Sequence, residues 1–374
     1  MQVKIAHVAD VHLGVKCGGL GNRYEQRNSE ITSTFYKILK ICEYENVDFL
    51  LIAGDLFDDI GVYDSYLKEL KRAFSKVNFK IIIAPGNHDP YTPDSPYGTK
   101  WPKNVFIFKS LEMSKISFPE YDLDVWGSAF RGPYKSKNFI ARADVDSNKL
   151  NICVMHGNLS NAENESYCPI SAADIENSNM DYIALGHIHK RSNIGCVGKT
   201  HFAYPGCPEG SGFDESGEKG FYIGTIGKGV CDLEFKKVCR RTYQNLEIDI
   251  SNFDSEYDII DKILGKMQEL FGSNCFDNIY KITLTGYIPE DSFVDINSLE
   301  TQINDKVFFA KLIDKTETEI DVEKLKFRND FKSIFIKKML GKIEAAITDE
   351  ERETNKLALK LGLRAFERDV KYNW

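Results

Sequence analysis

Five short blocks of the sequence combine side chains that bind metal ions, and each block follows a strand-like run. The blocks are Asp10-Val11-His12, Gly54-Asp55, Gly86-Asn87-His88-Asp89, His156-Gly157 and Gly186-His187-Ile188-His189. Imidazole nitrogens mixed with carboxylate and amide oxygens suit Mn²⁺, Fe²⁺ or Zn²⁺ and disfavour ions that prefer thiolates. Two such ions about 3.5–4 Å apart are the arrangement used to cleave phosphate esters. The blocks therefore predict a two-metal phosphoesterase site.

The spacing inside the blocks supports this prediction. Residues two apart on extended backbone project to the same side, so Asp10 and His12 can bind one ion. His187 and His189 are paired in the same way and can reach two neighbouring ions. Asp55 stands alone, which suits a carboxylate that bridges both ions, and Asn87 supplies a neutral amide oxygen.

The alternative, that these are unrelated turn and core residues, is set aside because five of the seven histidines lie in the blocks. His7 and His201 lie outside them. His7 is three residues before Asp10, so it is expected to point to the other face of its strand as a core histidine.

The elements that must position the blocks alternate between strands and helices. Apolar spacing at steps of three and four predicts one helix through Ile31–Cys42 and another through Leu67–Val77. Such alternation predicts an α/β core with parallel strands, whose carboxyl ends bring their loops together. A hairpin over Phe221–Ile226 and Val230–Val238 is expected to close this domain. The predicted strands are Val3–Ala9, Phe49–Ala53, Lys80–Ala84, Leu150–Met155 and Tyr182–Leu185.

Three domains are expected along the chain. Residues 1–240 form the catalytic domain, and residues 241–320 form a small α+β cap without histidine that positions the substrate. Residues 321–374 form a helical tail, in which Thr348-Asp349-Glu350-Glu351 is a capping box that opens the last helix. The run Leu357–Leu363 also alternates with a period of two, so a strand is the alternative there.

The composition of the chain limits the classes of protein to which it can belong. The chain has 374 residues and a net charge of −8, which argues mildly against nucleic acid, although metal-binding carboxylates inflate that figure. It has no apolar run long enough to span a membrane, and its start leaves no room for a signal peptide. Nine scattered cysteines predict a reduced, cytoplasmic protein.

At these blocks the sequence resembles the calcineurin-like metallophosphoesterase superfamily over about residues 1–238. The resemblance implies a four-layer sandwich of two mixed β-sheets flanked by helices. It also implies two divalent ions, most often Mn²⁺. One ion would be bound by Asp10, His12, Asp55 and His189, and the other by Asp55, Asn87, His156 and His187.

Three segments narrow the resemblance to the DNA-repair exonuclease branch that includes SbcD- and YhaO-like nucleases. They are His7–Gly14, Ala53–Asp58 and Tyr204-Pro205-Gly206. The branch implies a homodimeric DNA nuclease with an SbcC-type coiled-coil ATPase as partner, docked on the helical tail. Asp58 stands where some relatives have His, and Cys207 where they often have Ser.

Further residues are expected to take part in the reaction. His88, beside Asn87, is the candidate acid or phosphate-orienting group. Arg131, Lys135 and Lys137 lie in a Gly/Pro-containing loop, and Lys190 and Arg191 follow His189. Each of these cations could hold DNA phosphates or belong to an ordinary solvated surface. The alternatives to a DNA nuclease are a phosphoesterase acting on a small nucleotide or phosphoprotein, and a non-catalytic scaffold for an ATPase.

Overall fold

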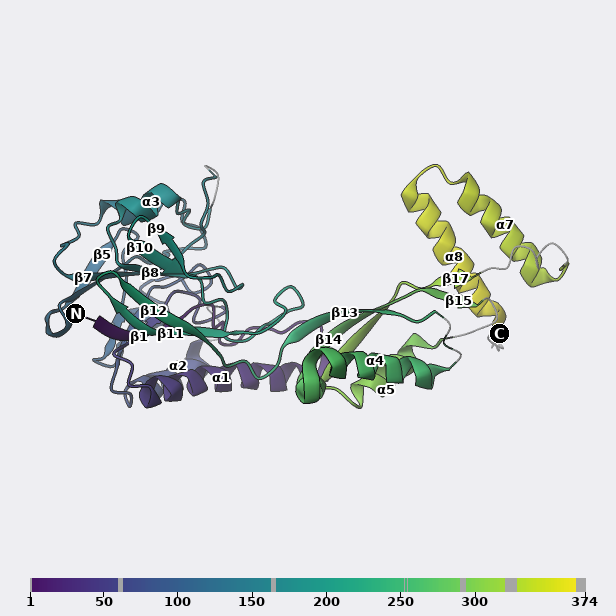
Figure 1. The fold of residues 1–374 in the computed structure, drawn as a ribbon, viewed down its shortest axis with the longest axis horizontal. Coiled ribbons are helices and arrows are strands. Elements are labelled where there is room, and N and C mark those ends of the chain that lie inside the picture. The colour runs from purple at the N-terminus through teal and green to yellow at the C-terminus, as the bar shows by residue number, and fades with distance from the viewer. Residues whose placement is uncertain are drawn as a thin grey trace. The chain divides into compact units, whose positions relative to one another are not determined.

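The computed structural model describes residues 2–59, 63–162, 166–251, 253, 255–289, 294–319 and 328–367. The chain divides into two compact units, Met1–Tyr243 and Gln244–Trp374. Figure 1 shows the helices and strands of both. Among the described helices, none combines the length and apolar character that a membrane span needs.

The first unit contains two six-stranded sheets, and the first of these carries three of the predicted blocks. Its strand order is β12-β11-β1-β2-β3-β4, in which β1, β2, β3 and β4 are parallel and β11 and β12 form an antiparallel hairpin at one edge. The bounds are β1 Gln2–Val8, β2 Phe49–Ile52, β3 Lys80–Ile83, β4 Val105–Ile107, β11 Gly220–Gly227 and β12 Val230–Lys237.

The second sheet carries the other two blocks and has the order β5-β6-β7-β8-β10-β9. Strands β6, β7, β8 and β10 are parallel, and β5 and β9 run antiparallel at the two edges. The bounds are β5 Ser114–Phe118, β6 Leu123–Gly127, β7 Leu150–His156, β8 Tyr182–Gly186, β9 Gly195–Val197 and β10 Thr200–Ala203.

Three apolar cores hold these layers together. Alternate side chains of β1 and β2, such as Ile5 and Leu51, fill the space between the sheets with residues of β7 and β8. Their neighbours, such as Ala6 and Leu50, pack under α1 (Tyr24–Tyr44) and α2 (Tyr63–Phe74) on the outer face. The outer face of the second sheet is covered by loops and α3 (Ala172–Asn177). The sandwich of two mixed sheets between helices confirms the predicted fold class.

His7 lies fully buried between the sheets, as the sequence predicted. Its Nδ1 is 2.9 Å from the Tyr182 hydroxyl and its Nε2 is 3.1 Å from the carbonyl oxygen of Leu185. Burial lowers the pKa of His7 to about 3, so the ring stays neutral at ordinary pH.

The second unit begins with a three-stranded sheet, order β13-β14-β16, packed against two helices. The strands are β13 Tyr243–Asp249, β14 Ile279–Thr285 and β16 Phe309–Asp314, and the helices are α4 Glu256–Phe271 and α5 Ile296–Asn304. A short parallel pair, β15 Tyr287–Pro289 and β17 Glu317–Glu319, extends this part.

Two helices complete the second unit, α7 (Phe331–Ala345) and α8 (Asp349–Glu367). They pack on each other through Ile336, Met339, Leu359 and Leu363. Leu357–Leu363 is therefore helix and not the alternative strand. The Lys360 ammonium also donates to Asp314 Oδ1 at 2.6 Å, so α8 contacts the end of β16. The expected boundary between cap and tail, at residues 320–321, lies outside the described residues.

Candidate metal centre

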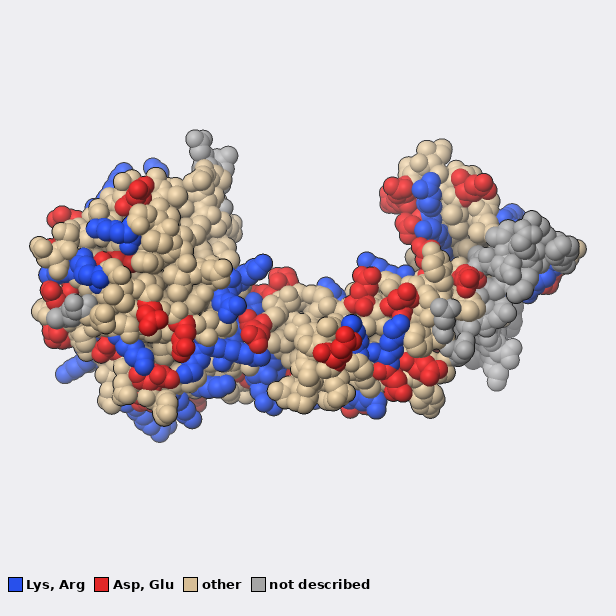
Figure 2. Space-filling model, in the orientation of Figure 1, with Lys and Arg blue, Asp and Glu red and all other residues tan. Residues whose placement is uncertain are grey.

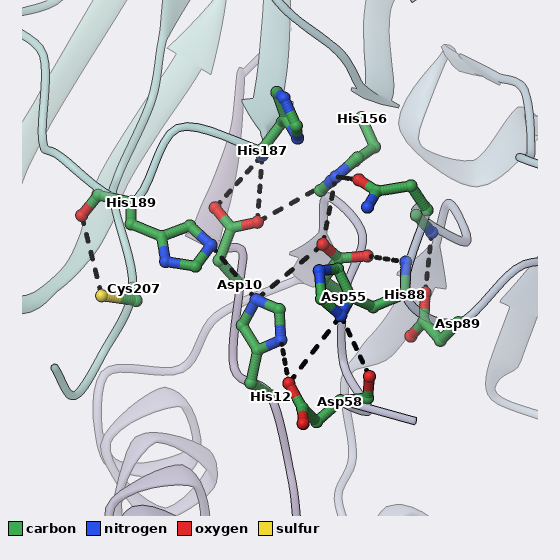
Figure 3. Close-up of polar contacts among 12 residues, drawn as sticks. Asp10, His12, Asp55, Asp58, His88, Asp89, His156, His187, His189 and Cys207 are labelled. Carbon is green, nitrogen blue, oxygen red and sulfur yellow. Dashed lines mark hydrogen bonds and ion pairs between the residues drawn. The ribbon is translucent and has the colours of Figure 1, made fainter. Parts of the chain in front are cut away.

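The five blocks lie at the carboxyl ends of five strands. Asp10, Asp55 and Asn87 follow β1, β2 and β3, while His156 ends β7 and His187 follows β8. Parallel strands place these ends at one edge of each sheet, and the two edges meet in the sandwich. Figure 3 shows the side chains that converge there.

The backbone at the centre takes conformations that most residues avoid. Asp10, His12 and Asp55 have φ of 52°, 49° and 49°, and His187 has φ of 102°. A positive φ at a non-glycine residue costs about 1–3 kcal/mol and is typical of functional sites, where the surrounding structure holds it in place. These four residues lie in the three loops that follow β1, β2 and β8.

Glycine precedes three of the predicted ligands, Asp55, Asn87 and His187, because the loops approach too closely for a side chain. A Cβ on Gly54 would lie 2.2 Å from Nδ1 of His156, and a Cβ on Gly86 would lie 2.1 Å from Oδ1 of Asp55. Gly-Asp and Gly-Asn are therefore parts of the packing of the site. They are more than generic turn signals.

The structure gathers the side chains of six of the seven predicted ligands into one cluster, and His187 joins it through its backbone N–H and a ring contact with His156. Nε2 of His12 lies 3.2 Å from Nε2 of His189, and ligand atoms of Asp10, His12 and His189 lie within 4.8 Å of one another. Asp10 also accepts hydrogen bonds from the backbone N–H of His187 at 3.0 and 3.2 Å.

Asp55 lies at the middle of this cluster. Its Oδ2 is 3.2 Å from Nε2 of His156 and 3.8 Å from Nε2 of His12. Nε2 of His156 is in turn 2.9 Å from Oδ1 of Asn87, and the His187 ring is 5.2 Å from the His156 ring. The Asp55 carboxylate thus faces both groups of donors, as a bridging ligand requires.

The electrostatics of the site favour added positive charge. Burial alone would lower the pKa of His12, but the hydrogen bond to Asp58 and the charges of Asp55 and Asp10 raise it to about 9. The pKa of His156 is raised to about 9 by Asp55 and Asp10, again against its burial. Burial would raise the pKa of Asp55, but these two imidazoles hold it well below its usual range. Carboxylates that retain protons on neighbouring imidazoles can bind divalent ions in place of those protons, so the donor set fits two metal ions.

Three of the predicted histidine ligands, His12, His156 and His189, are held by a hydrogen bond at the nitrogen that faces away from the cluster. Nδ1 of His12 donates to Oδ1 of Asp58 at 3.0 Å, and Nδ1 of His156 donates to the carbonyl oxygen of Ala53 at 2.9 Å. Nδ1 of His189 donates to Glu215. Such partners fix which nitrogen faces a metal and are typical of metal-binding histidines.

Glu215 was not predicted, because it lies in a Gly- and Ser-containing loop 26 residues after His189 and belongs to no motif. Burial would raise its pKa, but the hydrogen bond and charge of His189 lower it to about 2, so it is ionised. Asp58 was noted only as a departure from relatives, and the structure gives it a contact with His12.

Asp89 connects the loop after β2 to the loop after β3 through hydrogen bonds. Its carboxylate accepts hydrogen bonds from the backbone N–H groups of Gly86 at 2.8 Å, Leu56 at 2.7 Å and Phe57 at 3.1 Å. It is fully buried, and burial together with the charge of Asp55 raises its pKa to about 6. Asp89 thus fixes the position of the Gly-Asp loop relative to the Gly-Asn-His loop.

His88 lies at the rim of the cluster with its side chain 47% exposed. Its Nδ1 donates to the carbonyl oxygen of Asp58 at 3.0 Å, and its ring lies 4.8 Å from that of His12. Its backbone N–H donates to Oδ1 of Asp55 at 3.0 Å. The exposed ring is within reach of a molecule that binds at the centre.

The predicted DNA contacts divide into exposed and buried side chains. Lys190 and Arg191 are exposed, and the Arg191 guanidinium lies 4.1 Å from the centre of the Phe235 ring. Arg131 is exposed and donates to the carbonyl oxygen of Lys109 at 3.1 Å. Lys135 lies inside the domain instead, only 5% exposed, with its ammonium 2.6 Å from the Ser128 hydroxyl. A buried ammonium cannot meet a DNA phosphate at the surface, so Lys135 is removed from the expected contacts.

Residues 3–191 match the family described as calcineurin-like phosphoesterase. The match covers half of the chain and contains every block of the centre. The chain therefore belongs to the calcineurin-like phosphoesterase family, as the sequence predicted.

Two relatives indicate where in this family the chain lies. It is 27% identical over 349 residues to the uncharacterized metallophosphoesterase YhaO of Bacillus subtilis, covering 85% of this chain and 83% of the relative. It is 28% identical over 286 residues to the DNA double-strand break repair protein Mre11 of Aeropyrum pernix, covering 71% of this chain and 68% of the relative. These relatives support the DNA-repair nuclease branch.

Proposed function

We propose that the chain is a metal-dependent DNA nuclease of the SbcD type, which hydrolyses phosphodiester bonds in double-strand-break repair. The observation that carries this proposal is the convergence of predicted metal ligands on Asp55, with outer hydrogen bonds already in place at His12, His156 and His189. The name of the Aeropyrum relative supports DNA as the substrate.

Two divalent ions, for which we propose Mn²⁺, would be held by the seven side chains. When bound, they supply Lewis-acid activation of a phosphate ester and of a water molecule. In the reaction, a water oxygen forms a bond to phosphorus, and the bond from phosphorus to the leaving 3′ oxygen breaks. His88, exposed beside His12, would give a proton to the leaving oxygen or orient the phosphate.

Surface charge alone does not select the substrate. On the face drawn in Figure 2, basic and acidic side chains are interspersed over both units. Lys190 and Arg191 are exposed and directly follow the last block, Arg131 is exposed as well, and we propose that these three side chains contact DNA phosphates.

We further propose that the last two helices dock a coiled-coil ATPase. Phe331, Phe335, Met339 and Ile343 follow one another at steps of four along α7, so they lie on one face of this helix, but Met339 is buried against α8. Six large apolar side chains of α7, α8 and the turn between them remain exposed. They are Phe331 at 84%, Ile334 at 55%, Ile347 at 91%, Leu357 at 56%, Leu361 at 53% and Phe366 at 42%. Exposed apolar side chains at helical spacing suit a partner helix.

The nine cysteines are all free thiols, which supports a reducing, cytoplasmic compartment. We also propose a homodimer, by analogy with the SbcD-type branch.

Incubation of the purified protein with Mn²⁺ and end-labelled linear DNA tests the proposed activity. A bis-phosphodiester dye and a phosphomonoester dye are assayed in parallel, each with and without EDTA. DNA cleavage that EDTA abolishes supports the nuclease. Cleavage of a dye but not of DNA favours a phosphoesterase for small nucleotides or phosphoproteins. No hydrolysis of any substrate favours a scaffold for an ATPase.

A further inference from the structure

We propose that Glu215 is a positioning residue for His189, and that it makes the metal site of Asp10, His12 and His189 the tighter of the two. This inference rests on the proposed two-metal function. It concerns how strongly each ion is held and does not depend on which substrate is cleaved.

Both oxygens of Glu215 are engaged by neighbouring groups. Oε1 accepts a hydrogen bond from Nδ1 of His189, and Oε2 accepts hydrogen bonds from the backbone N–H of Ser211 at 2.6 Å and its hydroxyl at 3.1 Å. The Glu215 side chain is 10% exposed. With Nδ1 occupied in this way, His189 presents Nε2 toward Nε2 of His12, 3.2 Å away.

The loop that carries Glu215 is itself fixed at several points. The Tyr243 hydroxyl donates to the carbonyl oxygen of Ser211 at 3.2 Å, and the backbone N–H of Gly217 donates to the carbonyl oxygen of Tyr243 at 3.2 Å. Arg27, fully buried, donates to the carbonyl oxygen of Gly210 at 2.7 Å. The loop is therefore already ordered, so metal binding does not have to order it and loses little conformational entropy there.

The first metal site gains two outer carboxylates in this way. Glu215 accepts a hydrogen bond from Nδ1 of His189, and Asp58 accepts one from Nδ1 of His12 at 3.0 Å. A carboxylate on the outer nitrogen fixes the ring and increases the basicity of the inner nitrogen. Together with Asp10, these groups surround the first ion with negative charge.

In the second site, His156 has a neutral partner at the corresponding place. Nδ1 of His156 donates to the backbone carbonyl of Ala53 at 2.9 Å, and Asn87 contributes an uncharged amide oxygen. Asp55 faces both sites and Asp10 Oδ1 lies 3.8 Å from Nδ1 of His156, so the outer carboxylates Asp58 and Glu215 are what distinguish the first site. The difference in charge predicts that Mn²⁺ fills the first site before the second.

A different role for Glu215 must be distinguished. Ligand atoms of His189, Cys207 and Glu215 lie within 4.8 Å of one another and could hold an ion of their own. The thiol of Cys207 lies 3.8 Å from Oε2 of Glu215, the oxygen that already accepts from Ser211. If these residues formed a separate Mn²⁺ site, Cys207→Ser would change the Mn²⁺ stoichiometry, whereas the positioning role predicts no change.

The test is a Mn²⁺ titration of the full-length protein followed by electron paramagnetic resonance. We expect a tight and a weak class of site in the unmodified protein. Glu215→Gln should weaken the tight class by about 10–100-fold, and should raise the Mn²⁺ concentration for half-maximal activity by a similar factor without changing KM for DNA. Glu218→Gln is the matched control, because Glu218 is 61% exposed and pairs with Lys237 at 2.9 Å.

Asn87→Ala isolates the first site, since it removes a donor of the second site only. In that background, Glu215→Gln should weaken the remaining ion by the same factor. Unchanged binding in Glu215→Gln, or weakening of the weak class alone, would overturn the proposal. If Glu215→Gln fails to fold, Ser211→Ala and Tyr243→Phe provide a second test, because they loosen Glu215 without removing it. Both should weaken Mn²⁺ binding at the tight class of site, and unchanged binding in both would overturn the proposal.

The titration needs no nucleic acid, so the two proposals fail separately. Two bound Mn²⁺ ions without DNA cleavage would refute the nuclease function alone. DNA cleavage with unchanged Mn²⁺ affinity in Glu215→Gln would refute only the positioning role.

Discussion

His88→Ala separates a catalytic group from a metal ligand at the same rim. The substitution removes a ring that is 47% exposed and one hydrogen bond, from Nδ1 to the carbonyl oxygen of Asp58 at 3.0 Å. It leaves untouched the contact of the Asp58 carboxylate with His12. The backbone N–H that donates to Asp55 also remains.

The structural cost of His88→Ala is small compared with the expected catalytic cost. Loss of one hydrogen bond at a half-exposed side chain lowers the free energy of unfolding by about 0.5–1.5 kcal/mol at most. Loss of a general acid or phosphate-orienting group lowers the rate by about 10²–10⁴-fold. At about 1.36 kcal/mol for each tenfold, this is roughly 3–5 kcal/mol of activation free energy. A folding defect therefore cannot account for the expected loss of rate.

The assay measures DNA turnover and bound Mn²⁺ on the same sample of His88→Ala. We expect turnover to fall and two Mn²⁺ equivalents to remain. His201→Ala, a histidine in β10 outside the blocks, is the matched control and should keep its turnover. If His88→Ala loses one Mn²⁺ equivalent, His88 is a ligand, and if turnover stays near normal, it has no role in the chemistry.

Three further predictions address the bridge, the core and the tail. Asp55→Asn should abolish turnover, because the carboxylate that faces both groups of donors loses its charge, and hydrolysis that resists EDTA would contradict the mechanism. Because burial lowers the pKa of His7 to about 3, the fold favours the neutral ring, so its contribution to stability is present above about pH 6.5 and is lost as the pH falls. Between pH 7 and pH 5 the free energy of unfolding, measured with urea, should fall by about 2 kcal/mol, and this fall should be absent in His7→Gln. An equal fall in His7→Gln would exclude His7 as the cause. Leu357→Glu combined with Leu361→Glu should abolish co-purification with the ATPase while leaving basal nuclease activity intact. Truncation after Lys324, which lies outside the described residues, should have the same effect. Retained co-purification in either variant would place the docking site elsewhere.

Much of the fold could be predicted because the signals are local. The five strands ahead of the blocks are continuous apolar runs, and each is observed within about two residues of its predicted bounds. Helices α1 and α2 follow from apolar spacing at steps of three and four, and α8 follows from the capping box that opens it. Short strands such as β4, β9 and β10, of three or four residues, are too brief for a period to be recognised and were missed.

The donor atoms of the centre were also determined by the sequence, since binding chemistry belongs to residue types. Aspartate, asparagine and histidine placed just after strands must meet at the edges of a parallel sheet. Glycine before Asp55 and before Asn87 is required by the close packing that the structure shows.

Only the tertiary structure decided which residues accept hydrogen bonds from the histidine ligands and which charged side chains reach the surface. Glu215 reaches His189 across 26 residues, and Asp58 reaches His12 across 46. Lys135, a cation in a loop, turns inward to Ser128 and is lost as a DNA contact. No local pattern encodes these contacts, because they depend on how loops from different strands pack together. The sequence thus determined which groups could bind metal, while packing between distant segments decided how they are oriented and how firmly they are held.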